Sequence, residues 1–320
     1  DVLREKLRTR RSVAVIATFR DSERPHGPPD HLIESLTSEG FLTVVVDTSK
    51  SLPTQPLSCD LVIQRLNVGW DFASWMSTLA RFPWLMDETD RLLLVNDSNV
   101  GPLRPIGPMM EAGRTLGLDV WGLTDSWDTR YHLQSYFLLF EQSALRSGHL
   151  QSFLDSFTFP SVKDKIIGSG EIGLSRFLDE AGLRIGAVFP YTELAQSFLD
   201  GVPDRIGHVL SFPENQLDTA RVSDIDEVNF VLDTVDRVRS SAPVNPTHYF
   251  WDILVDKGSP FVKRELLTKN PEAIPGLHRL ADKIAGEPGE KILEREVSLW
   301  SRSHPDVSLP LALHWQPRHH

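Results

Sequence analysis

Residues 91–102, with the sequence RLLLVNDSNVGP, decide the predicted fold. After Arg91, residues 92–95 form an apolar run of strand length, which ends at four polar residues, Asn96 to Asn99. In open α/β sheets, ligands bind where the carboxyl ends of such core strands emerge. The stretch therefore predicts a buried strand that delivers polar side chains to a binding site.

Apolar runs alternate with helical patterns on both sides of this stretch. Strands are predicted at residues 12–17, 41–46, 61–63, 92–95, 120–123 and 135–140, and helices at 31–38 and 72–82. This alternation is typical of an α/β fold with a largely parallel sheet. Helical patterns dominate later, at 170–181, 225–238 and 277–284. We expect one α/β domain over residues 1–202 and a mainly helical subdomain over 203–320, packed on it.

Composition narrows the class of protein. The chain has 320 residues, of which 40% are hydrophobic, so it can bury a large core. The net charge of -11 argues against non-specific binding to nucleic acid, which needs a basic surface. A single cysteine, Cys59, excludes an internal disulfide framework and indicates a reducing compartment, so we expect a cytoplasmic location. Because the chain opens at Asp1 without a methionine, we also expect further domains in a longer polypeptide.

Several common chemistries lack their motifs in this sequence. There is no Gly-x-Gly-x-x-Gly after a strand, no Gly-Lys-Ser phosphate loop, no His-Glu-x-x-His and no Gly-x-Ser-x-Gly. These absences argue against a dehydrogenase, a P-loop nucleotidase, a zinc hydrolase and a serine esterase.

The order of the remaining motifs resembles that of inverting glycosyltransferases of the A fold. The matching parts are a first strand at Val13–Thr18, a strand ending in Asp47, the segment Asn67-Val68-Gly69, an Asp-x-Asp-like segment at 97–99, and Glu171 in a helical stretch. The resemblance implies an α/β fold of the glycosyltransferase A type, with a mixed, mainly parallel sheet flanked by helices and a C-terminal helical appendage.

Within that fold, the motifs resemble those of the rhamnan synthesis F family, a group of bacterial polysaccharide rhamnosyltransferases. The segments that carry the resemblance are NVGWDF at 67–72, NDS at 96–98, WGLT at 121–124, HLQSYF at 132–137, EIGLS at 171–175, NPTHYFWD at 245–252 and PFVKRELL at 260–267. The resemblance implies transfer of a deoxyhexose, L-rhamnose from dTDP-L-rhamnose, to a lipid-linked oligosaccharide or polysaccharide of the bacterial cell surface. A peripheral location at the inner face of the cell membrane stays open beside the cytoplasmic one.

The resemblance assigns Glu171 as the base that activates the acceptor hydroxyl. Inverting transfer needs a carboxylate that takes this proton as positive charge develops at the anomeric carbon. The structural alternative is a glutamate that only stabilises a helix N-terminus. The expected nucleotide-sugar site contains Asp47, Arg65, Asn67, Gly69, Asp71, Asn96, Asp97 and Ser98. The expected acceptor-binding residues are Trp121, His132 and Gln134, and the expected diphosphate-binding residues are His248, Lys263 and Arg264.

A metal requirement stays open at the level of sequence. Asp97 is the candidate ligand for Mg²⁺ or Mn²⁺ bridging the diphosphate, but Asn99 stands where an Asp-x-Asp motif has its second carboxylate. A metal-independent mechanism, in which cationic side chains neutralise the leaving diphosphate, is the alternative. Asp71 has the alternative role of a helix cap, and Lys263 and Arg264 that of a solvated face.

Two other functions fit the same sequence. The first is a non-catalytic glycan-binding or scaffold module of a polysaccharide assembly enzyme, suggested by the imperfect Asp-x-Asp motif. The second is a sugar-nucleotide hydrolase, in which water replaces the acceptor hydroxyl.

Overall fold

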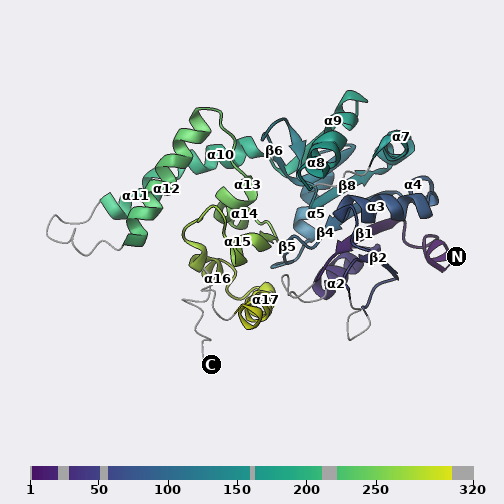
Figure 1. Cartoon of the computed structure of the whole chain (residues 1–320), viewed down its shortest axis with the longest axis horizontal. Coiled ribbons are helices and arrows are strands. Elements are labelled where there is room, and N and C mark those ends of the chain that lie inside the picture. The colour runs from purple at the N-terminus through teal and green to yellow at the C-terminus, as the bar shows by residue number, and fades with distance from the viewer. Residues whose placement is uncertain (1, 21–28, 51–56, 159–162, 211–221, 305–320) are drawn as a thin grey trace.

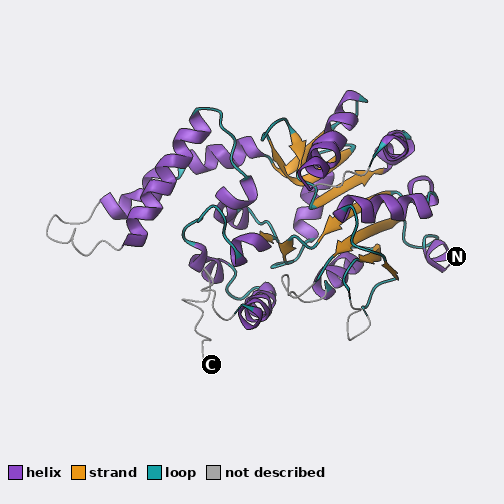
Figure 2. Ribbon diagram, viewed as in Figure 1, coloured by secondary structure: helices purple, strands orange, loops and turns teal. Residues whose placement is uncertain are grey.

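The computed structural model describes residues 2–20, 29–50, 57–158, 163–210 and 222–304, and these form a sheet with helices on both faces (Figures 1 and 2). The strands are β1 Ser12–Thr18, β2 Phe41–Asp47, β3 Leu61–Gln64, β4 Arg91–Asn96, β5 Asn99–Val100, β6 Val120–Ser126, β7 His132–Leu133, β8 Phe137–Glu141, β9 Ile185–Phe189 and β10 Val262–Lys263.

The helices fall into two groups along the chain. Those before residue 190 are α1 Val2–Lys6, α2 Asp30–Ser38, α3 Trp70–Arg81, α4 Trp84–Glu88, α5 Gly107–Thr115, α6 Gln142–Arg146, α7 His149–Ser156, α8 Lys163–Ile166, the π-helix η1 Ile167–Ile172 and α9 Gly173–Glu180. Those after it are α10 Tyr191–Asp200, α11 Val202–Leu210, α12 Val222–Arg239, α13 Pro246–Tyr249, α14 Trp251–Asp256, α15 Arg264–Thr268, the 3₁₀-helix η3 Leu277–Arg279, α16 Leu280–Lys283 and α17 Gly289–Ser303.

The main sheet has eight strands in the order β3-β2-β1-β4-β8-β6-β7, with β9 paired to β6. Strands β1 to β4 are parallel, as is the β6–β9 pair, whereas β8 runs antiparallel between β4 and β6. This is the mixed, mainly parallel sheet flanked by helices that we predicted. The central strands β1 and β2 are buried along their whole length, because helices cover both faces.

Two hydrophobic cores lie on opposite faces of the sheet. One contains side chains of α1, α3, α4 and α6 to α9, including Trp75 and Leu174. The other contains side chains of α2, α5, α10 and the helices from α12 onward, including Phe250 and Leu293. The C-terminal helices thus share one continuous core with the sheet. Because β10 pairs with β5, the C-terminal segment also reaches the end of β4, where ligand-binding residues were expected.

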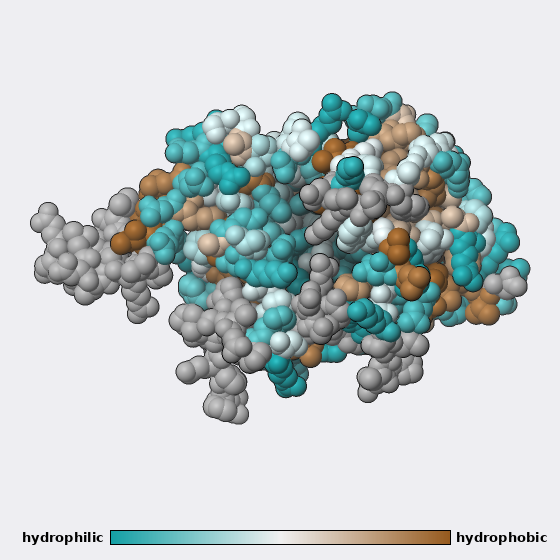
Figure 3. All heavy atoms as spheres, viewed as in Figure 1, coloured by the Kyte–Doolittle hydropathy of each residue, from teal (hydrophilic) through white to brown (hydrophobic). Residues whose placement is uncertain are grey.

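Helices α11 and α12 pack on each other and extend away from the sheet (Figure 1). Brown apolar side chains show on this pair in Figure 3, and Ile225 and Leu232 of α12 are half exposed. None of the helices in the described residues combines the length and the apolar character needed to cross a membrane.

Candidate functional site

The carboxyl ends of β1, β2 and β4 bring the predicted donor-site residues to one edge of the sheet. The parallel register places Thr18 beside Asp47 and Ala17 beside Asn96. A parallel sheet aligns the ends of its strands, so residues far apart in sequence become neighbours there.

Asp97 is fixed to the end of β1. Its Oδ2 accepts hydrogen bonds from Thr18 Oγ1 at 2.7 Å and from the backbone N–H of Phe19 at 2.8 Å. The preceding residue, Asn96, donates from Nδ2 to Asp71 Oδ2 at 2.8 Å, and its Oδ1 accepts from the N–H and Oγ of Ser98. This hydrogen bond ties the first turn of α3 to the end of β4.

At the end of β2, Asp47 is completely buried and accepts from Arg20 Nη2 at 3.0 Å and from the N–H of Ser49 at 2.8 Å. A buried carboxylate needs such a partner because desolvation strongly disfavours an isolated charge. Sequence reasoning missed Arg20. Its position directly after the first strand and before the Pro- and Gly-rich loop was the available signal.

The segment between β3 and α3 contains three further predicted donor-site residues. Arg65 donates to Ser74 Oγ at 3.0 Å and to the carbonyl of Val68 at 2.5 Å, and burial lowers the pKa of its guanidinium. Asn67 is exposed in this loop. Gly69 precedes α3 with a φ of 77°, a left-handed conformation that glycine adopts without a steric penalty.

Glu171 lies in a polar cluster with His132 and Ser135. Its Oε2 accepts from the N–H of Ser135 at 2.7 Å and from the Ser135 hydroxyl, and its Oε1 lies 3.4 Å from His132 Nε2. The Glu171 side chain is 18% exposed. We expected Glu171 at the start of a helix, and this was wrong. The helical run begins at Lys163, and Glu171 lies within the π-helix η1, a type of helical distortion frequent at functional sites.

The two ring nitrogens of His132 have different neighbours. Nδ1 lies 2.8 Å from the carbonyl of Arg130, which only accepts, so Nδ1 carries a proton. Nε2 then meets the Glu171 carboxylate as a hydrogen-bond donor only when the ring is an imidazolium. Burial by itself lowers the pKa of His132, but Glu171 and the Arg130 carbonyl outweigh it and raise the pKa above its ordinary value.

The same cluster determines the charge of Glu171. Burial by itself raises the pKa of its carboxyl, but the hydrogen bonds from His132 and Ser135 together outweigh burial and lower the pKa. Glu171 is therefore ionised at neutral pH. Ser135 precedes Tyr136, whose carbonyl accepts from the N–H of Asn96, so the cluster connects directly to the end of β4.

The three predicted diphosphate-binding residues occupy different environments. Lys263 Nζ lies 3.3 Å from Ser98 Oγ and above the ring of Tyr136, so it belongs to the site. Arg264 holds the loop after β4, because it donates to the carbonyls of Asp97 and Asn99 and pairs with Glu296. His248 is buried, with Nδ1 2.7 Å from Glu272 Oε2.

Two of the predicted acceptor-binding residues are engaged in the protein interior. Trp121 is 1% exposed, its ring packs against Gly113, and its Nε1 donates to Glu141 Oε1 at 3.2 Å. The structure therefore does not offer this ring to a ligand. Gln134 accepts from Thr124 Oγ1 at 2.6 Å and donates to Asn245 Oδ1 at 3.2 Å.

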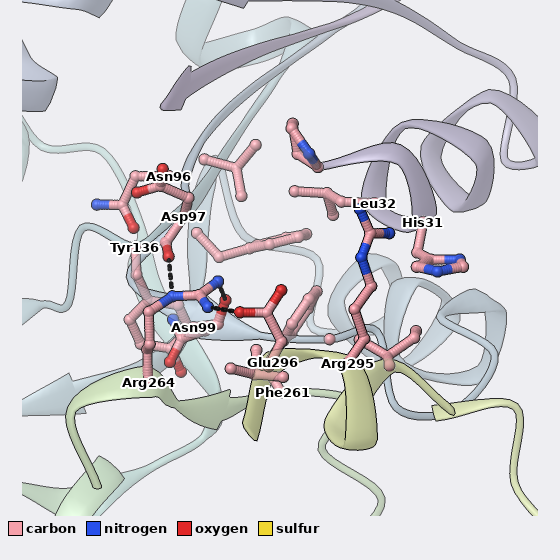
Figure 4. Close-up of a pocket in the computed structure, with 16 residues that line it drawn as sticks. His31, Leu32, Asn96, Asp97, Asn99, Tyr136, Phe261, Arg264, Arg295 and Glu296 are labelled. Atoms are coloured by element: carbon pink, nitrogen blue, oxygen red, sulfur yellow. Dashed lines mark hydrogen bonds and ion pairs between the residues drawn. The ribbon is translucent and has the colours of Figure 1, made fainter. Parts of the chain in front are cut away.

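A pocket opens beside this edge of the sheet, between α2 and α17 (Figure 4). Asn96, Asp97 and Asn99 form one wall together with Arg264, and Arg295 extends from α17 on the facing side toward the start of α2. Its remaining lining is mostly apolar, including Phe137, Phe261 and Ile292. Sequence reasoning assigned no role to Arg295.

The donor set at Asp97 does not fit a bound divalent cation. Among the residues that the structure describes, no group of three His, Cys, Asp or Glu side chains could hold a metal ion. Asn99, the position of the second Asp-x-Asp carboxylate, has a buried Nδ2 with no acceptor among the residues that the structure describes. This N–H donor would repel a cation and favour an anionic ligand.

Three known proteins are similar to parts or most of this chain. Virulence protein VirA of Vibrio anguillarum is 29% identical over 233 residues, which are 72% of this chain and 69% of VirA. The uncharacterized protein y4gN of Sinorhizobium fredii is 24% identical over 174 residues, 52% of this chain and 45% of y4gN. A crystal structure of S. aureus TarS covers 92% of both chains at 12% identity, with a TM-score of 0.36.

A match to a family model identifies the protein family of this chain. The model of rhamnan synthesis protein F matches residues 45–205, which are half of the chain. The matched range contains Asp47, the segment 67–72, the end of β4 and Glu171. The chain belongs to the rhamnan synthesis protein F family.

Proposed function

We propose that this chain is an inverting glycosyltransferase that moves L-rhamnose from dTDP-L-rhamnose onto a bacterial cell-surface polysaccharide acceptor. Membership of the rhamnan synthesis protein F family supports the sugar and the product. The observation that carries the proposal is the Glu171 cluster, in which a carboxylate is held ionised beside the strand end where a donor would bind.

Glu171 takes the proton of the acceptor hydroxyl in this mechanism. Each carboxylate oxygen has two lone pairs, and His132 and Ser135 occupy only part of this accepting capacity. A depressed pKa makes Glu171 a weak base in the ground state. The proton moves when the anomeric carbon has become electron-poor, and at that stage the acceptor oxygen is far more acidic than a free alcohol.

The donor would lie along the ends of β1, β2 and β4. Asp47 and Arg65 are at the nucleotide end, whereas Asn96, Asp97 and Lys263 are at the sugar-diphosphate end. Lys263 supplies positive charge near the leaving group. Asp71 and Ser98 orient these groups through Asn96 rather than by contact with the donor.

The same proposal implies the partners of the chain. A nucleotide-sugar donor and a lipid-linked oligosaccharide or polysaccharide acceptor meet at this site, at the inner face of the cell membrane.

The test is Glu171→Gln, which keeps the shape of the side chain and removes the base. Turnover of dTDP-L-rhamnose should fall by about 100-fold or more, while dTDP binding measured by calorimetry stays within about twofold of wild type. Glu180→Gln on α9 is the matched control, because Glu180 is exposed and Arg176 is its one ion-pair partner among the described residues. Full turnover by Glu171→Gln would rule out the base assignment, and glycan binding without nucleotide binding would favour a non-catalytic module.

A further inference from the structure

Two hydrogen-bond donors in the pocket between α2 and α17 have no acceptor among the described residues. Asn99 Nδ2 is buried and donates to no group, and the exposed guanidinium of Arg295 makes no hydrogen bond or ion pair with a described residue. A buried unsatisfied N–H costs about 1–3 kcal/mol, so native proteins usually pair it. The two donors line the same pocket, and a ligand rich in acceptor oxygens would satisfy both.

The negative charges of this pocket already have partners. Glu296 pairs with Arg264, which also donates to the carbonyls of Asp97 and Asn99. The Asp97 carboxylate accepts from Thr18 and from the N–H of Phe19. Arg295, in contrast, has no ion-pair partner among the described residues.

The pocket and the Glu171 cluster lie on opposite faces of the sheet. The helices η1 and α9 around Glu171 pack on the face that carries α3, whereas α2 and α17 pack on the other face. Both regions meet at the end of β4, through Asn96 and Asp97. Inversion requires the base and the leaving group on opposite sides of the reacting carbon. A donor bound at the end of β4 with Glu171 on one side of its anomeric carbon would therefore direct its diphosphate toward the pocket.

We propose that Arg295 and the Asn99 amide bind the diphosphate of the nucleotide-sugar directly, in the place that a divalent cation takes in sites with two carboxylates. This inference rests on the proposed function. A guanidinium can donate two parallel hydrogen bonds to a phosphate, and an amide adds a third donor at a fixed position. Together they neutralise and orient the leaving group without a metal ion.

The first experiment measures binding of dTDP, thymidine and inorganic pyrophosphate by calorimetry in the presence of EDTA. Arg295→Gln should weaken dTDP and pyrophosphate by about tenfold and leave thymidine unchanged, because it removes only a phosphate contact. Arg302→Gln is the matched control, since Arg302 is also an exposed arginine of α17 but does not line the pocket. Unchanged dTDP affinity in Arg295→Gln would overturn the inference.

The second experiment uses Asn99→Asp, which creates the missing carboxylate of an Asp-x-Asp motif. In EDTA its dTDP affinity should fall by more than about tenfold, because an anion replaces a donor facing the phosphates. Added Mn²⁺ should restore this affinity in Asn99→Asp and change wild-type binding by less than about twofold. Urea unfolding would show whether each variant is folded.

The outcomes also separate this inference from the proposed function. A wild-type protein that binds dTDP only with Mn²⁺ overturns the direct contact and leaves the glycosyltransferase proposal standing. A folded wild-type protein that binds neither dTDP nor thymidine overturns both.

Discussion

The Glu171 cluster and the α2–α17 pocket lie on either side of the end of β4, and they differ in how their polar groups are satisfied. In the cluster, both oxygens of Glu171 and Nδ1 of His132 have protein partners. In the pocket, neither Asn99 Nδ2 nor the guanidinium of Arg295 has a partner within the described part of the chain. The first arrangement is organised before any ligand arrives, and the second is complete only with one.

This difference separates two kinds of functional residue. A group that must hold one charge state through a reaction cycle is best fixed by the protein itself. A group that contacts a transient ligand has to leave its donors available, and it gives up stability in the free protein. Substitutions in the two regions should therefore affect stability very differently.

The largest loss of stability is expected from a substitution in the Glu171 cluster. His132→Leu leaves the Glu171 charge without its cationic partner, so the free energy of unfolding at neutral pH should fall by about 3 kcal/mol. Arg295→Leu should change it by less than about 0.5 kcal/mol, because no interaction is lost. Urea unfolding measures both. If the two substitutions lowered the free energy of unfolding equally, the cluster and the pocket would not differ in their contribution to stability.

The cluster should also show a defined pH dependence. The raised pKa of His132 contributes stability below its ordinary value of 6.5, and this contribution is lost as the pH rises through the folded-state pKa. The lowered pKa of Glu171 contributes stability above its ordinary value of 4.5, and this is lost as the pH falls through the folded-state pKa. The stability difference between wild type and His132→Leu should therefore be greatest between these two values. A pH-independent difference in urea titrations would argue against an ion pair.

A substitution where α17 meets the loop after β5 should cause an intermediate loss of stability. A Cβ on Gly289 would lie 2.2 Å from Leu103 Cα, so Gly289→Ala must displace α17. We expect a loss of about 1–3 kcal/mol in stability, and weaker pyrophosphate binding because Arg295 moves with the helix. Gly207→Ala, where the new methyl group meets nothing within 4 Å, should be neutral or slightly stabilising. If Gly289→Ala is destabilised but binds pyrophosphate with unchanged affinity, α17 does not contribute to phosphate binding in the pocket.

The smallest effect is expected at Ser98, which lies between the two regions. Its hydroxyl donates to Asn96 Oδ1 at 2.6 Å and accepts from Lys263 Nζ, so Ser98→Ala should cost about 1 kcal/mol. Ser77→Ala, which removes only a hydrogen bond within α3, provides the control. Thermal unfolding and turnover would both be measured. A larger loss of turnover than of stability would indicate that Ser98 contacts the donor itself.

Much of the fold was predictable because it depends on local sequence. The apolar runs at Phe41–Asp47 and Arg91–Asn96 are buried strands, and the predicted helices at α2, α3 and α12 are present. The helices α5 and α17 and the strand β9 were not predicted. Gly107, Pro108 and Gly113 interrupt the helical signal of α5, and a Cβ on Gly113 would lie 2.6 Å from the ring of Trp121.

The sequence by itself determined the order of the strands along the chain, the polar ends of the strands and the family of the protein, because these are properties of neighbouring residues. The tertiary structure alone decided which of the polar residues meet. In it, Glu171 contacts His132, which lies 39 residues earlier in the sequence, and Arg295 of α17 lines the pocket beside Asp97. No local pattern encodes such contacts, since they arise from the packing of helices on two faces of one sheet.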